Sequence, residues 1–235
     1  MQRYFIDSYI TDTTVHLNEA MMHHLNRVLR LKQTTTICVV DASSRVFEVR
    51  IEPNQEVGTI LNEINQKDDF PIDLTLAVAL LKKDKFEWVI QKATELGATR
   101  ILPFVSERTI IDVDVKDFEK KRVRYQTIAK EASEQSHRKH MCQIESLHSF
   151  KQVCHRSAAF KGLCFERVEH ESVSLQACMN LASLVVVGPE GGFSHQEVEL
   201  ARSHGFKLIS LGHKTLRAET AAIAVCAMIE AYHDQ

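Results

Sequence analysis

From residue 72 to the end of the chain, short apolar segments alternate with longer segments of helical period, and this alternation restricts the fold more than any other feature. The segments with the composition of strands are 72–80, 100–104, 161–165, 184–187 and 207–211. The segments with helical periodicity are 84–96, 115–136, 194–205 and 217–233. Because parallel strands are joined by crossovers that are usually helical, the pattern predicts an α/β domain with a mostly parallel sheet.

Two of the predicted helices carry signals at their ends. Asp84 and Glu87 have the spacing of a capping box, in which two side chains satisfy free backbone N–H groups at a helix start. Gly97 follows that helix and predicts its end. Ser194 and Glu197 repeat the capping-box spacing at the start of the later helix.

Residues 1–70 have the pattern of a smaller, mostly β domain. Segment 47–52 alternates apolar and charged side chains, segment 36–40 is apolar, and the polar residues 41–44 between them predict a hairpin. A helix is predicted at 21–31, with Asn18 as its cap.

The polar stretch 65–71 ends in proline and is the predicted linker. We therefore expect two domains, 1–70 and 72–235.

The composition excludes several classes of protein. The chain has 235 residues, 44% of them hydrophobic and 26% charged, and a formal net charge of -2, which excludes bulk disorder and a histone-like polycation. No segment has the length and apolar character of a signal peptide or a membrane span. The expectation is a cytoplasmic protein without membrane association.

Cysteine and histidine usage gives no indication of a metal. None of the six cysteines forms a C-x-x-C pair, and the twelve histidines show no zinc-binding spacing. We expect reduced thiols in the core and no metal.

Glycine is scarce and concentrated in one part of the chain. Five of the eight glycines lie between positions 188 and 212, three of them in Gly188-Pro189-Glu190-Gly191-Gly192 directly after the apolar strand 184–187. Glycine lets a ligand approach the backbone, and α/β folds bind ligands at the carboxyl ends of strands. The segment predicts a ligand-binding loop that is neither a P-loop nor a dinucleotide fingerprint, and a tight structural turn is the alternative.

A second glycine loop, 211–221, follows the predicted strand 207–211. Arg217 and Glu219 flank the start of the last helix. A glutamate there is explained by helix capping alone, whereas an arginine opposes the helix dipole and favours an anionic partner. Segment 221–229 is apolar nearly all round, which predicts burial within the domain or between subunits.

Two stretches of the chain are rich in basic residues. They are 23–32, which has no acidic residue, and 120–140. Solvated faces are the usual explanation of such runs, and a continuous surface that follows nucleic-acid phosphates is the alternative.

Several groups of residues, taken together and in order, resemble the ribosomal RNA small subunit methyltransferase E family of the SPOUT superfamily. The matching motifs cover nearly the whole chain: Arg3-Tyr4-Phe5, His24 with Val28-Leu29-Arg30, residues 85–97, Glu131-Ala132 with Glu134-Gln135 and Arg138, residues 188–192, and Leu211-Gly212 through Leu216-Arg217-Ala218-Glu219-Thr220-Ala221.

The resemblance implies a PUA-like RNA-binding β-barrel at 1–70 and a SPOUT domain at 72–235, whose C-terminal part forms a deep trefoil knot. It implies a homodimer that binds S-adenosylmethionine in the knot and methylates the 3-position of a uridine in 16S ribosomal RNA, free or in the assembled small subunit. The alternatives are another SPOUT RNA methyltransferase or a non-catalytic ribosome-assembly factor that binds RNA.

The resemblance also carries site residues onto this chain. Those expected at the cofactor are Phe165, Glu166, Gly188, Pro189, Glu190, Gly191, Gly192, Leu211, Gly212, Leu216, Arg217, Thr220 and Ala221. Those expected at the RNA are Arg3, His24, Arg27, Arg30, Lys85 and Arg138.

Methylation of the uracil ring nitrogen requires loss of its proton, and a nearby cation stabilises the charge that develops. We expect Arg138 to supply this charge or to hold an RNA phosphate, and Arg217 with Glu219 to order the cofactor loop. Glu134 is a candidate general base. Cys142 and Thr215 depart from the family pattern, and because neither change removes a charge, we expect only altered loop packing.

Overall fold

The computed structural model describes residues 1–66, 73–82, 84–111, 113–166, 173, 175 and 181–233. The chain divides into two compact units, Met1–Asp69 with Ser133–Met141, and Phe70–Ala132 with Cys142–Gln235. The expected domains 1–70 and 72–235 differ from these units in segment 133–141, which the structure assigns to the first unit. Most of the predicted linker 65–71 lies outside the described residues.

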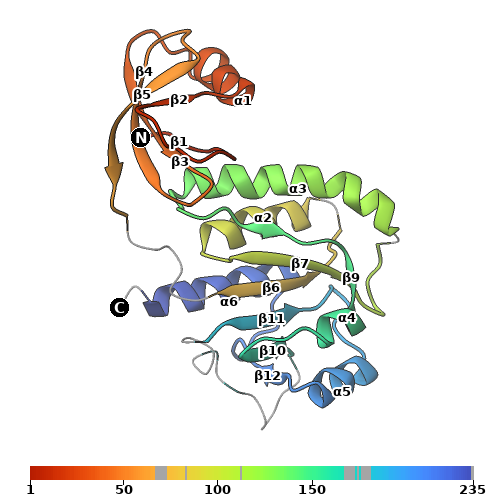
Figure 1. Cartoon of the computed structure of the whole chain (residues 1–235). Coiled ribbons are helices and arrows are strands. Elements are labelled where there is room, and N and C mark those ends of the chain that lie inside the picture. Colours follow the sequence, from red (N-terminus) through yellow and green to blue (C-terminus); the bar gives the residue numbers. More distant parts are fainter. Residues whose placement is uncertain are drawn as a thin grey trace. The chain divides into compact units, whose positions relative to one another are not determined.

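The first unit is built on a five-stranded sheet with the order β1-β3-β4-β5-β2. Its strands are β1 (Arg3–Phe5), β2 (Thr14–His16), β3 (Thr35–Val40), β4 (Val46–Ile51) and β5 (Val57–Ile64). β1 and β3 pair in parallel, and the other neighbours pair antiparallel. One helical segment, α1 (Glu19–His23) continued by the π-helix η1 (His24–Val28), precedes β3 (Figure 1).

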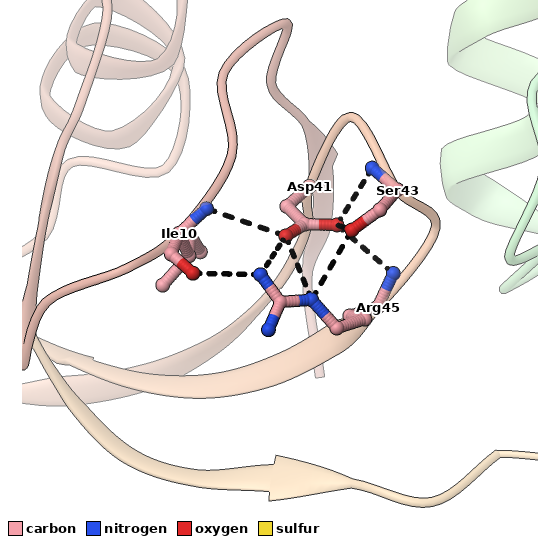
Figure 2. Close-up of polar contacts among 4 residues, drawn as sticks. All are labelled: Ile10, Asp41, Ser43 and Arg45. Atoms are coloured by element: carbon pink, nitrogen blue, oxygen red, sulfur yellow. Dashed lines mark hydrogen bonds and ion pairs between the residues drawn. The ribbon is translucent and has the colours of Figure 1, made fainter.

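β3 and β4 form the predicted hairpin, with Val40 opposite Val46 and Thr35 opposite Ile51. Along β4 the side chains of Phe47, Val49 and Ile51 are buried, as the alternating pattern predicts. The turn between the strands is organised by Asp41, whose carboxylate accepts hydrogen bonds from Ile10, Ser43 and Arg45 (Figure 2).

The predicted helix 21–31 has different limits in the structure. It begins at Glu19, where the side chain of Asn18 accepts a hydrogen bond from the Met21 N–H at 2.9 Å, and its π-helical part ends at Val28. Arg30 follows with a φ of 51°, a left-handed conformation that ends the helical path before residue 31.

The second unit contains a sheet whose described strands follow the order β12-β10-β11-β6-β7-β8, with β9 also paired to β7 (Figure 1). These strands are β6 (Leu74–Ala79), β7 (Arg100–Val105), β8 (Gln143–Ile144), β9 (His148–Ser149), β10 (Phe160–Cys164), β11 (Ser183–Val187) and β12 (Lys207–Ile209). All of these pairings are parallel, which confirms the predicted α/β class.

Helices cover both faces of this sheet. They are α2 (Lys85–Glu95), α3 (Val115–Gln135), α4 (Phe150–Cys154), α5 (His195–Ser203) and α6 (Ala218–His233). One core packs α2, α3 and α6 against side chains such as Leu76 and Val78 of β6, and the other packs α4 and α5 against Ala77 and Ala79 of the same strand. β6 is therefore buried on both faces, which explains its nearly continuous apolar sequence.

The two predicted capping boxes have different outcomes. At α5 the Ser194 and Glu197 side chains both bond to backbone N–H groups, so the prediction is confirmed. At α2 it is wrong, because Asp84 has helical dihedral angles and its side chain makes no capping bond. Glu87 instead pairs with Arg124 at 2.8 Å. Gly97 ends the helix with a φ of 88°, as predicted.

Candidate active site

A cavity of about 800 Å³ lies in the second unit at the carboxyl ends of its parallel strands. The loops after β7, β10, β11 and β12 contribute to it, together with Lys85 at the start of α2. Its lining residues are Lys85, Arg108, Cys164, Phe165, Glu166, residues 187–193, His195, residues 209–218 and Ala221. This is the edge at which open α/β sheets bind ligands, and the volume is that of a small-molecule site.

The loop after β11 has its conformation fixed by local contacts. The N–H of Gly192 donates to the Pro189 carbonyl at 2.9 Å, and Gly192 has a φ of 67°, which favours glycine. A Cβ on Gly188 would lie 2.8 Å from the Phe193 ring, so glycine allows this ring to pack under the loop. The Phe193 ring in turn packs against Phe104 and Phe150 in the core.

The loop after β12 leads directly into the first turn of α6. Gly212 has a φ of 110°, which closes the loop between β12 and α6. Glu219 is buried in the first turn of α6, and its Oε1 lies 2.9 Å from the Nζ of Lys85. The same Nζ lies 3.9 Å from Oε1 of Glu190, so Lys85 joins carboxylates from both glycine loops.

The electrostatics of Glu219 favour its charged form. Burial by itself raises the pKa of a carboxyl, but a backbone hydrogen bond and the positive charges of Lys85 and Arg217 outweigh it, so the pKa of Glu219 lies below its ordinary value. Glu219 is therefore an anion at neutral pH and keeps Lys85 at the pocket wall.

The loop after β7 contributes Arg108, a residue that sequence reasoning missed. Its Nη1 donates to the Gly191 carbonyl at 3.0 Å. The N–H of Glu107 donates to the buried carboxylate of Glu197 at 2.9 Å, which anchors this loop to the start of α5. The available signal was its position directly after a parallel strand, since such loops meet at one edge of the sheet.

The structure brings most of the expected cofactor residues together. Of that set, only Thr220 is absent from the pocket lining, and it is exposed on α6. Arg217 lines the pocket. Glu219 is not part of the lining, but it forms an ion pair with Lys85, which is. Lys85, expected at the RNA, lies in this pocket as well.

Glu134 and Arg138, the other expected catalytic residues, belong to the first unit. Oε1 of Glu134 accepts the N–H of Phe5 at 3.1 Å, and Arg138 is 4% exposed. His137, between them, has a φ of 60°.

Arg3, expected at the RNA, is buried in the first unit and holds this segment. Its Nη1 donates to the carbonyls of His137 at 2.6 Å and Arg138 at 2.9 Å, and its Nη2 donates to Gln66 at 2.8 Å. The guanidinium thus holds the His137 and Arg138 carbonyls in place, and its expected contact with RNA stays a prediction.

His24 starts the π-helix η1, and the hydroxyl of Tyr4 lies 2.9 Å from its Nδ1. Burial, together with the charge of Glu134, raises the pKa of Tyr4 to about 12. Arg27 and Arg30 are exposed on and after η1, so their charges are available at the surface of the first unit.

Within the part of the chain that the structure describes, no group of histidine, cysteine and acidic side chains is arranged to hold a metal ion. The described cysteines are free thiols, four of them buried, and Cys178 lies outside the described residues. No described helix combines the length and the apolar character that a membrane span requires.

Comparison with known proteins gives consistent matches along the chain. Residues 68–230 match the model of the RNA methyltransferase domain family. The ribosomal RNA small subunit methyltransferase E of Bacillus subtilis is 34% identical, over 95% of this chain and 93% of the relative. The protein of the same name from Synechocystis is 33% identical over 94% of this chain and 74% of the relative.

Solved structures agree with these matches. The methyltransferase E of Neisseria gonorrhoeae, solved with bound S-adenosylmethionine, has a TM-score of 0.85 and 27% identity, covering 99% of this chain and 98% of that one. A putative methyltransferase from Legionella pneumophila, also solved with S-adenosylmethionine, has a TM-score of 0.88 and 26% identity, covering 98% and 97%. On these matches, the chain belongs to the ribosomal RNA small subunit methyltransferase E family.

Proposed function

We propose that this chain transfers the methyl group of S-adenosylmethionine to the 3-position of a uridine in small-subunit ribosomal RNA. The relatives named above are ribosomal RNA small subunit methyltransferases, and two structural relatives hold S-adenosylmethionine. The observation that carries the proposal is that both glycine loops of the family motif line one cavity of about 800 Å³.

The residues of the cavity fit this cofactor. Gly188, Gly191 and Gly212 expose backbone at the pocket wall, without side chains in the way. Leu211 and Leu216 offer apolar contacts. Glu166 and Glu190 add negative charge to a lining that also contains Lys85 and Arg217. When bound, S-adenosylmethionine supplies an activated methyl group on a positively charged sulfur. Holding that methyl in line with the acceptor nitrogen accounts for much of the catalysis that we expect.

The chain's own residues divide the remaining work. Lys85 and Glu219 fix the start of α6 at the pocket wall, and Arg217 places a cation on the lining. We assign to Arg138 the stabilisation of negative charge on the uracil or the binding of a phosphate, and to Glu134 the removal of the ring proton. The ring nitrogen loses its proton as its bond to the methyl group forms, and the neutral thioether leaves.

The proposal also includes architecture finer than the α/β class. We propose that the C-terminal part of the second unit is a trefoil knot, that the first unit is a PUA-like barrel that binds RNA, and that the enzyme acts in the cytoplasm as a homodimer. In support, the glycine loops that the resemblance assigns to the knot follow β11 and β12, and Arg27 and Arg30 are exposed on the first unit.

The test is methyl transfer from labelled S-adenosylmethionine to unmodified small ribosomal subunits and, in parallel, to naked small-subunit RNA, followed by nucleoside analysis. Label in 3-methyluridine is the expected result, and the better substrate shows whether the enzyme recognises a folded particle. Label in another nucleoside would contradict the position and favour a different SPOUT methyltransferase. Absence of cofactor binding would favour a non-catalytic RNA-binding protein.

A further inference from the structure

Arg108 combines a fixed backbone with a largely unused guanidinium at the cofactor pocket. Among the described residues, the guanidinium has a single hydrogen-bond partner, the Gly191 carbonyl at 3.0 Å, and no carboxylate. An arginine has five N–H donors. The Arg108 residue is exposed, so most of its donors face solvent at a wall of the pocket.

The surrounding residues hold Arg108 in this place. The preceding N–H, of Glu107, is bound by the buried Glu197, and the N–H of Ser106 donates to Thr109 at 2.9 Å, which closes a turn around Arg108. The Cβ of Arg108 lies 3.1 Å from where a Cβ on Gly191 would stand. Because glycine at 191 has no side chain, Arg108 can pack directly against the loop that follows β11.

Lys85, another basic residue of the pocket lining, already has carboxylate partners. Lys85 lies 2.9 Å from Glu219 and 3.9 Å from Glu190. The positive charge of Lys85 is balanced by these two carboxylates. The positive charge of Arg108 has no carboxylate partner among the described residues. An unpaired, preorganised guanidinium is suited to an anionic oxygen.

We propose that Arg108 binds an anionic oxygen of the RNA substrate at the rim of the cofactor pocket. The inference rests on the proposed function, which makes RNA the polyanion that must reach this pocket. Two RNA groups carry the required chemistry, a backbone phosphate and the uracil carbonyl oxygens when the ring loses its proton. The first acts in binding and the second in the chemical step.

The test compares Arg108→Gln, Arg108→Lys and wild-type enzyme. Calorimetry with S-adenosylmethionine measures cofactor affinity, and methyl transfer to small ribosomal subunits at several salt concentrations gives KM and kcat. Arg156→Gln is the matched control, because Arg156 is exposed in the same unit, pairs with Glu145 at 2.7 Å and lies outside this pocket.

We expect Arg108→Gln to keep cofactor affinity within about twofold and to lower kcat/KM for RNA by about tenfold or more, with Arg108→Lys between it and wild type. If Arg108 contacts a phosphate, Arg108→Gln raises KM and reduces the magnitude of the slope of log(1/KM) against log salt by about one. If Arg108 contacts a uracil oxygen instead, Arg108→Gln lowers kcat and leaves that slope unchanged. The control should match wild type in all three measurements.

Two outcomes overturn the inference. Equal losses of cofactor affinity and kcat/KM assign Arg108 to the cofactor, and unchanged values assign it to holding the Gly191 carbonyl alone. If wild-type enzyme methylates no small-subunit RNA, the proposed function fails by itself. Filter binding of the same RNA to wild type and Arg108→Gln then still decides whether Arg108 contacts RNA.

Discussion

Asp41 is a buried carboxylate that joins two separate stretches of the first unit. It accepts hydrogen bonds from the N–H groups of Ile10, Ser43 and Arg45, from the Ser43 hydroxyl and from the Arg45 guanidinium, which also donates to the Ile10 carbonyl (Figure 2). Burial raises the pKa of Asp41, but these hydrogen bonds outweigh it, and the pKa lies below its ordinary value.

Replacing Asp41 by asparagine removes the charge and one acceptor oxygen. We expect Asp41→Asn to lower the free energy of unfolding by about 1.5–3 kcal/mol at neutral pH, the range for hydrogen bonds to a charged group. A lowered native pKa gives stability that is present above the unfolded value, about 3.9, and is lost as pH falls through the native value. The difference between variant and wild type should therefore shrink below about pH 4.

Urea denaturation at pH 7, 5 and 3, followed by circular dichroism, measures this difference. Asp12→Asn is the control, because Asp12 is exposed in the same unit. A difference that stays constant down to pH 3 would contradict the assigned role of the charge.

At the scale of elements, the end of α3 depends on a residue far away in the sequence. The Arg138 N–H donates to the Ser133 carbonyl at 3.0 Å and the His137 N–H to the Glu134 carbonyl at 3.3 Å, the pattern of a Schellman motif with His137 at the left-handed position. Glycine usually occupies that position, because other residues pay about 1–2 kcal/mol there. Arg3 donates hydrogen bonds to the carbonyls of His137 and Arg138, and these bonds offset this cost.

We expect Arg3→Lys to destabilise the first unit by about 2–3 kcal/mol, because an ammonium group lacks the planar fork that reaches two carbonyls and Gln66 together. Since the same bonds hold the Arg138 backbone, kcat should fall more than cofactor affinity. Thermal denaturation, calorimetry and methyl transfer measure the three quantities. Arg27→Lys, at an exposed position, is the control for stability, and equal effects of the two variants would contradict the role of Arg3.

The contrast between two helix starts shows the limit of a sequence signal at this scale. Ser194 has an extended backbone, with φ -74° and ψ 162°, which directs its side chain at the N–H of Glu197. Asp84 has nearly the same φ but a ψ of -2°, and its carboxylate does not reach that position. The residue pattern is equivalent in both places. The difference lies in the path by which the chain enters the helix, which residue types alone do not specify.

At the scale of the whole molecule, the proposed cofactor site lies within the second unit alone. A ligand that binds only the folded state at 100 times its Kd stabilises that state by about 2.7 kcal/mol. We expect S-adenosylmethionine at that concentration to raise the free energy of unfolding of the second unit by this amount. Trp88, the single tryptophan of the chain, lies on α2 of that unit, so its fluorescence follows the relevant transition.

Gly191→Val is the matching variant for this measurement. A Cβ at 191 would lie 3.1 Å from the Cβ of Arg108, and the valine methyl groups would fill the pocket rim. We therefore expect the fold to be kept at reduced stability without ligand, and no shift with S-adenosylmethionine. An equal shift in variant and wild type would place the cofactor elsewhere.

The sequence alone determined the features that depend on local pattern. Apolar period and helix-end residues predicted the parallel α/β class, the β3–β4 hairpin and most element limits in the second unit, because burial of one face imposes its period on the residues. The sequence did not predict the short strands β8 and β9 or the helix α4, because elements of two to five residues are too short to show a period. Ser149 and Gln152 form a capping box at α4, and their spacing was the available signal.

The tertiary structure decided which partner each charged side chain takes. Arg3, Lys85 and Arg108 are all basic residues in the sequence, yet one is buried in the first unit, one joins two glycine loops and one crosses a loop with its charge unpaired among the described residues. It also assigned segment 133–141 to the first unit. These outcomes depend on which distant segments the strand order and the packing bring together, and a charge finds its partner only after that arrangement exists.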